Sequence, residues 1–154
     1  MQLRNTSYLI YSTILLLFPL LWLGCATPKP PPPLDTADAS RAATVLAQRL
    51  LEKGVFDKVA SPPAKTRLLT VVNNTDQHFD TSMFGNKLQV ALNESGKVSI
   101  VLNPAMPVDY ILSGKIISTY VRTSERRDRT YTFQLTLSDT QGSVVWVGEE
   151  EIKK

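Results

Sequence analysis

The sequence predicts an α+β fold: a two-layer sandwich in which helices cover one face of a mixed, mostly antiparallel sheet. Two segments carry apolar residues at helical spacing, and strand-like segments dominate the chain after residue 97. A strand, a helix and a second strand follow one another between residues 67 and 102, which favours parallel pairing of these two strands. The expected element order is α-β-α-β-β-β-β.

The first helix is expected over residues 38–53. Asp38 or Ser40 can cap its N-terminus, and Gly54 stands where a left-handed C-terminal cap is favoured. Its apolar face is formed by residues at helical spacing, namely Ala42, Val45, Leu46 and Leu50.

A short strand over residues 67–72 follows a proline break. Apolar residues occupy both parities of this segment, which predicts a strand buried on both faces: Leu68, Leu69, Val71 and Val72. A polar loop over 73–79 then leads to a second helix over 82–94, with Asp80 or Thr81 as its cap. The apolar stripe of this helix comprises Met83, Phe84, Lys87, Leu88, Ala91 and Leu92.

The rest of the domain is expected to be strands, over residues 98–102, 110–122, 131–139 and 144–152, with a charged turn over 123–129. Residues 131–139 alternate strictly, as in an antiparallel strand with one face buried and the other near solvent. The apolar side is Tyr131, Phe133, Leu135 and Leu137, and the polar side is Thr132, Gln134, Thr136 and Ser138.

The N-terminal segment predicts a secretory leader. Arg4 precedes an uncharged apolar run over residues 8–23, and Gly24 and Cys25 follow it. The run contains Pro19 and is shorter than the roughly 20 residues of a membrane span, the alternative interpretation. The string Leu-Trp-Leu-Gly-Cys resembles the bacterial lipobox, which implies a signal peptide over 1–24 and a lipidated Cys25. It also implies the outer membrane, because Ala26 is not the aspartate that favours retention in the inner membrane.

These features divide the chain into three parts: the leader, a lipidated Cys25 with a Pro-rich tether over 25–36, and a periplasmic domain over 37–154. Residues 28–33 read Pro-Lys-Pro-Pro-Pro-Pro, a semi-rigid spacer. The net charge is +3, and loss of the leader with Arg4 lowers it by one, so neither nucleic acid nor an anionic membrane surface is indicated.

The residue inventory argues against an enzyme and against a cofactor or metal. Cys25 and His78 are the chain's only cysteine and histidine, and no glycine-rich phosphate loop is present. A hydrolase would have to pair His78 with Asp76 or Asp80, and a surface histidine is the simpler interpretation.

A protein-binding surface is expected on the uncovered face of the sheet, around the polar row of residues 132–138. The 73–78 loop and the charged turn are candidates to flank it. The candidate contact residues are Asn74, Asp76, His78, Arg126, Arg127, Arg129 and Gln134.

From residue 67 onward the sequence resembles the LpoB family of penicillin-binding protein activators. The stretches that carry the resemblance occur in the family's order, at residues 69–76 (Leu-Thr-Val-Val-Asn-Asn-Thr-Asp), 92–101, 109–114 (Asp-Tyr-Ile-Leu-Ser-Gly) and 131–146. The resemblance implies a fold similar to the N-terminal domain of TolB. It also implies an outer-membrane lipoprotein that is not an enzyme, and that binds a bifunctional penicillin-binding protein and stimulates peptidoglycan synthesis.

Two departures from the family pattern bear on this resemblance. Only residues 103–108 stand where the family usually has helical sequence, and the tether is short. The alternative function is that of a structural or secretion-associated periplasmic lipoprotein with a TolB-like interaction domain.

Overall fold

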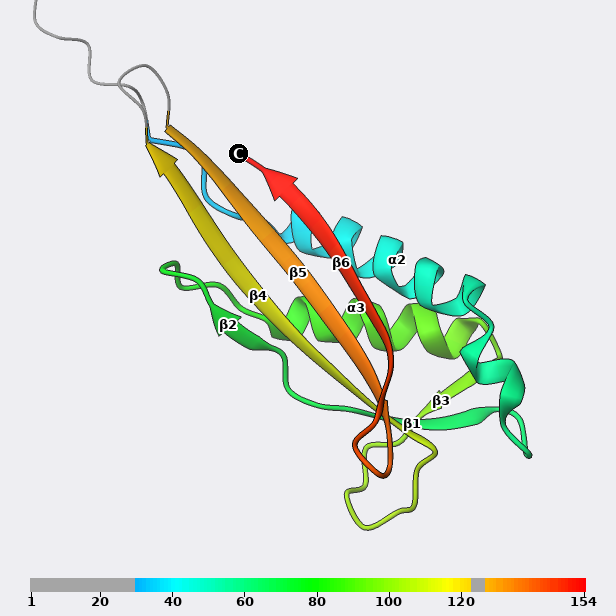
Figure 1. Ribbon diagram of the computed structural model, residues 1–154. Helices are drawn as coiled ribbons and strands as arrows, with labels where there is room; N and C mark the ends of the chain where they lie inside the picture. The colour runs from blue at the N-terminus through cyan, green and yellow to red at the C-terminus, as the bar shows by residue number, and fades with distance from the viewer. Residues whose placement is uncertain (1–29, 123–126) are drawn as a thin grey trace, which may run out of the picture.

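A computed structural model describes residues 30–122 and 127–154, and Cys25 and Arg126 therefore lie outside the described residues. Two helices, α2 (Thr36–Glu52) and α3 (Ser82–Glu94), pack side by side against one face of a six-stranded sheet (Figure 1). This arrangement confirms the predicted α+β two-layer fold. No helix in the described ranges has the length and apolar character needed to cross a membrane.

The sheet combines a parallel part with an antiparallel part. Its strand order is β3-β1-β4-β5-β6, with β2 paired to β4 beside β1. The pairs made by β1 and β2 are parallel, whereas β4, β5 and β6 are joined in antiparallel order. The strands are β1 (Ala64–Leu68), β2 (Val72–Asn74), β3 (Val98–Ile100), β4 (Tyr110–Arg122), β5 (Arg127–Asp139) and β6 (Val144–Lys153).

The first predicted strand is in fact two. β1 and β2 both pair with β4, and residues 69–71 between them interrupt the strand. Val71 is buried, but Leu69 is 44% exposed and Val72 is 53% exposed. The prediction of burial on both faces is therefore wrong, because the helices cover only one face and the outward residues stay in solvent.

Helix α2 begins earlier than expected. Asp35 is its N-cap, and its carboxylate accepts a hydrogen bond from the backbone N–H of Asp38. The Asp35 N–H in turn donates to the Asp38 carboxylate, which completes a capping box. The predicted caps, Asp38 and Ser40, thus lie inside the helix. At the other end Gly54 adopts φ 66°, the left-handed conformation that was predicted.

The two helices and the sheet enclose one core. Phe84 of α3 lies over Phe133 of β5, with ring centroids 5.1 Å apart, and both are fully buried. Helix α3 has the predicted bounds, yet Met83 of its predicted stripe is 37% exposed. A short 3-10 helix (Val55–Lys58) closes one end of the core, where Phe56 meets Tyr110 edge to face.

Helix α2 also covers the edge strand β6. The Arg49 guanidinium donates to the main-chain carbonyl of Glu149 at 2.8 Å and forms an ion pair with Glu150 at 2.9 Å. Glu150 lies two residues before the buried Ile152 on β6, so its side chain points to the same, helix-covered face. Arg49 on α2 can therefore reach it.

The sheet has two distinct ends. At the near end, where β4 finishes and β5 begins, the Leu34 N–H donates to Gln77 Oε1 at 3.2 Å and Lys154 pairs with Asp35 at 3.4 Å. The segment from residue 30 to the start of α2 therefore lies beside the near ends of β4 and β5 (Figure 1). At the far end, where β4 begins and β5 finishes, lie the loop over residues 101–109 and the turn over 140–143.

Candidate functional site

The face of the sheet opposite the helices is open. Along β5 the residues that point to the helices are fully buried, namely Tyr131, Phe133, Leu135 and Leu137. The residues between them are partly exposed, namely Thr132, Gln134, Thr136 and Ser138. The predicted alternation is confirmed, and the polar row lies on the open face.

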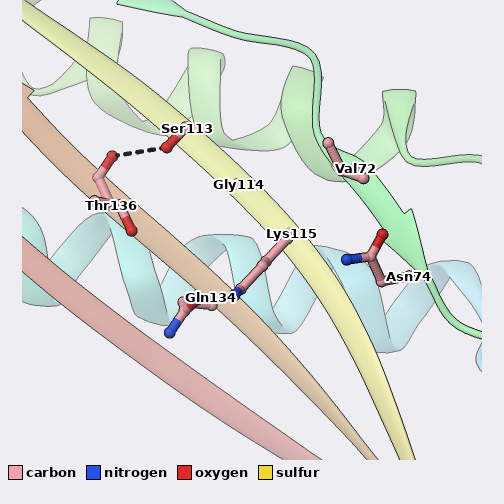
Figure 2. A pocket seen from close by; sticks show the side chains of 7 residues that line it. All are labelled: Val72, Asn74, Ser113, Gly114, Lys115, Gln134 and Thr136. Carbon is pink, nitrogen blue, oxygen red and sulfur yellow. Dashed lines mark hydrogen bonds between the residues drawn. The ribbon is translucent and has the colours of Figure 1, made fainter.

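A shallow hollow of about 360 Å³ lies in the middle of this open face (Figure 2). Three strands supply its lining: Val72 and Asn74 from β2; Ser113, Gly114 and Lys115 from β4; and Gln134 and Thr136 from β5. Pairing explains the convergence, because Lys115 stands opposite both Val72 and Gln134.

Gln134 is the centre of a polar row that crosses three strands. It pairs with Lys115 on β4 and with Glu149 on β6, and its side-chain amide donates to the Glu149 carboxylate. Nearby, the Ser113 hydroxyl donates to the Thr136 carbonyl at 3.4 Å. The row presents a cation, an amide and a carboxylate in sequence, so it can both donate and accept hydrogen bonds with a protein partner.

The hollow is lined mainly by polar side chains. Its lining has no histidine, cysteine or carboxylate to serve as nucleophile, base or metal ligand. No group of three histidine, cysteine or acidic residues is placed to hold a metal ion in the described part of the chain. Short polar side chains beside exposed Val72 suit close approach by another protein surface.

Two of the predicted contact residues meet at this hollow. Asn74 and Gln134 belong to segments far apart in the sequence, yet both line it. Asp76 and Arg129 also meet, through a 2.9 Å ion pair at the near end. They meet on the helix side of the sheet, because Arg129 lies two residues before Tyr131 on β5 and its side chain points to the same face.

Arg129 is held by its neighbours. Its side chain is only 15% exposed, and its guanidinium lies 5.4 Å from the Tyr120 ring centroid. A hydrogen bond to the Tyr131 hydroxyl and, to a smaller extent, the Asp76 carboxylate raise the pKa of Arg129. This cluster fixes the 73–79 loop to the sheet, since the Tyr131 hydroxyl also donates to Gln77 at 2.7 Å.

The histidine-based hydrolase has little support from the geometry. His78 is exposed, whereas the carboxylate of Asp76 is engaged by Arg129 and by the Ser118 hydroxyl at 3.3 Å. Asp80 accepts from the Ser82 N–H at 2.9 Å, and bonds from Ser82 are the main cause of its lowered pKa.

The charged turn is shorter than predicted. β5 begins at Arg127, opposite Arg122, so Arg127 and Arg129 belong to the strand, not to the turn. The strand extends because hairpin pairing with β4 continues through these charged residues. Arg126 lies outside the described residues.

Several lining residues were not predicted. Thr136 belongs to the predicted polar row, but Val72, Ser113, Gly114 and Lys115 were not named as part of the surface. The sequence does carry a signal for two of them, because Ser113 and Lys115 alternate with Leu112 and Ile116 in the 110–122 segment. Their outward parity follows from that alternation.

Comparison with known proteins identifies relatives of the whole domain. A family model described as "Peptidoglycan-synthase activator LpoB" matches residues 38–108 and 104–152. No curated protein matches the chain in sequence.

Solved structures show the same fold at low sequence identity. The LpoB C-terminal domain from Escherichia coli matches with a TM-score of 0.54 and 14% identity, covering 75% of this chain and 98% of that one. The LpoB C-terminal domain from Salmonella enterica gives a TM-score of 0.51 and 17% identity, with 75% and 98% covered. The family model spans most of the described domain, and the chain belongs to the LpoB family of peptidoglycan-synthase activators.

Proposed function

We propose that this protein is an outer-membrane lipoprotein that binds a bifunctional penicillin-binding protein from the periplasmic side and stimulates its synthesis of peptidoglycan. Membership of the LpoB family is the observation that carries the proposal. Lipidation of Cys25 supplies the anchor, and the domain after residue 36 supplies the binding surface.

The open face is the proposed binding site for the partner. Three strands supply residues to its hollow, and the Gln134 amide at its centre bonds to the Glu149 carboxylate, which an acceptor group of the partner can replace. Interfaces of this kind draw most of their binding energy from a few central contacts. Gln134 is the most central polar group, so we expect its replacement to have the largest effect.

Activation by binding requires no chemistry from this chain. The described residues offer no metal cluster, and the two carboxylates beside His78 are engaged by Arg129 and Ser82. The contribution of the protein is therefore the free energy of binding to one conformation of the synthase, which shifts its population towards that state.

The chain offers a matched pair of variants for the test. Gln134→Arg changes the open face, whereas Gln48→Arg changes an exposed glutamine on α2 that also bonds a glutamate, Glu52, at 2.9 Å. Lipidated full-length protein would first be used to capture penicillin-binding proteins from membrane extract. The recovered synthase would then be assayed for glycan polymerisation with each variant.

We expect Gln134→Arg to weaken binding and stimulation about tenfold or more, and Gln48→Arg to match wild type. Wild-type activity of both variants would place the interface outside the open face and outside the exposed face of α2 around Gln48. Recovery of a secretion or assembly component with no penicillin-binding protein would instead favour the structural or secretion-associated function.

The anchor is tested separately by mass spectrometry of the protein purified from membranes. The expected mass is that of the chain from Cys25 onward plus its acyl groups. An intact Met1 or a free Cys25 thiol contradicts the lipoprotein assignment.

A further inference from the structure

We infer that the far end of the sheet, with the 101–109 loop, forms the apolar part of the surface that contacts the synthase. This inference rests on the proposed function and adds the orientation of the domain. The near end faces the membrane to which the protein is anchored, and the far end faces the synthase.

The position of the N-terminal segment sets this orientation. Leu34 is buried and bonded to Gln77, so the tether can begin only at the near end. From Cys25 to Leu34 a Pro-rich chain reaches about 30 Å, at roughly 3.1 Å per residue. The 13 residues of β4 then carry the far end about 44 Å further, at roughly 3.4 Å per residue.

A synthase that reaches the domain from the side away from the lipid anchor is therefore met first by the far end. The near end stays within about 30 Å of the lipid anchor, and the far end can stand more than twice as far from it. With so short a tether, the length of the sheet itself supplies most of the reach across the periplasm.

The far end carries exposed apolar side chains suited to a protein partner. Leu102 is 78% exposed and Met106 is 45% exposed, both in the 101–109 loop. Val144 and Val145, at the start of β6, are 59% and 41% exposed. Both segments lie at the far end of the sheet (Figure 1), and exposed apolar side chains gathered in one region are typical of interaction sites.

The 101–109 loop is held in place on the open face. Arg67 of β1 donates to the carbonyl of Pro104 at 2.9 Å and to the carbonyl of Met106 at 2.7 Å. Arg67 stands opposite Ile111 of β4, which shares a face with Ser113 and Lys115. The Arg67 side chain therefore points to the same open face as the hollow. The loop and the hollow thus lie on the same face of the sheet, and the two bonds from Arg67 fix the loop there.

The open face and its far end together supply both kinds of contact that protein interfaces use: polar groups in the hollow, and exposed apolar side chains in the 101–109 loop. An apolar anchor supplies binding energy while surrounding polar groups fix the orientation of the partner. Ordering the loop in advance also lowers the entropy that binding would otherwise cost.

Site-specific photo-crosslinking in cells tests the orientation with the full lipidated chain. A photoreactive amino acid would replace Leu102 or Met106 at the far end, Val121 at the near end, or Gln134 at the centre. Val121 is a matched control, because it is 55% exposed and apolar. We expect crosslinks to a penicillin-binding protein from Leu102, Met106 and Gln134, and none from Val121.

Each other outcome overturns a definite statement. Crosslinks to the synthase from Val121 but not from Leu102 or Met106 would overturn the orientation and leave the proposed function standing. A crosslink from Leu102 to a second copy of this chain would likewise overturn the inference. Absence of penicillin-binding protein crosslinks from all four positions would also overturn the inference, whereas failure of the full-length protein to capture any penicillin-binding protein from membrane extract would overturn the proposed function itself.

A binding measurement gives an independent check. The double variant Leu102→Glu with Met106→Glu should weaken binding to the synthase about tenfold or more, whereas Val121→Glu should bind as wild type. All three side chains are exposed, so the thermal midpoints should stay unchanged. Unchanged affinity of the double variant would overturn the inference.

Discussion

The two faces of the sheet are built from the same strands and yet differ in how deeply their side chains are buried. On β5, Phe133 is fully buried under the helices, whereas its neighbour Gln134 faces the hollow on the open side. Burial of the covered face stabilises the fold, and the open face contributes little to it. Alternate residues along β5 thus divide into those that stabilise the fold and those that belong to the proposed interface, so the proposed interface can change without unfolding the domain.

The strongest way to test this separation is to truncate two adjacent residues. Phe133→Ala removes a ring that packs on Phe84 and should lower the free energy of unfolding by about 3–5 kcal/mol. Gln134→Ala, one position along, should change it by no more than about 0.5 kcal/mol. Urea denaturation gives both values, and similar losses would mean that the open face also carries stability.

A smaller effect is expected from enlarging a residue on the covered face. A methyl group at Gly114 would lie 3.1 Å from Leu135 Cδ2 and 3.2 Å from Val71 Cγ2, so Gly114→Ala forces these side chains apart. Its expected cost is about 1–3 kcal/mol. Ser113→Ala, on the open face beside it, is the control, and equal midpoints for the two variants would contradict the tight packing.

The smallest expected effect concerns the near end and depends on pH. The backbone N–H of Asp38 and, less strongly, Lys154 lower the pKa of Asp35 below its ordinary value of 3.8. Its stabilising contribution is thus present above that value and is lost as the pH falls through the lowered pKa. Asp35→Asn should therefore reduce the thermal midpoint slightly at neutral pH and not at strongly acidic pH. Parallel curves for variant and wild type would contradict this.

Much of the fold follows from local patterns. Helix α3 matches its expected range because residues 82–94 combine apolar spacing with a left-handed glycine beyond the end, Gly96. The split of the first strand was not predictable, since it depends on pairing with β4. The N-cap of α2 was missed because Asp35 and Asp38 are equally suitable cap residues by type. Only the reciprocal hydrogen bonds between them show that the helix begins after Asp35.

The site was less predictable than the fold. Alternation along β5 placed Gln134 on the open face, but the convergence with Asn74 depends on strand order. Asp76 and Arg129 were each expected to flank the open face, yet they meet in an ion pair on the helix side. The 73–79 loop turns towards the helices because Asn73, opposite the inward Ile116, donates to the carbonyl of Gln77 at 2.9 Å.

Arg49 has a consequence for self-association. A long edge strand such as β6 offers free main-chain groups to which a strand from another copy can add, the first step towards a fibril. In this domain Arg49 occupies the Glu149 carbonyl, and its ion pair with Glu150 holds it there. The bonded Glu149 carbonyl is therefore closed to an added strand, while the open face of the sheet stays accessible.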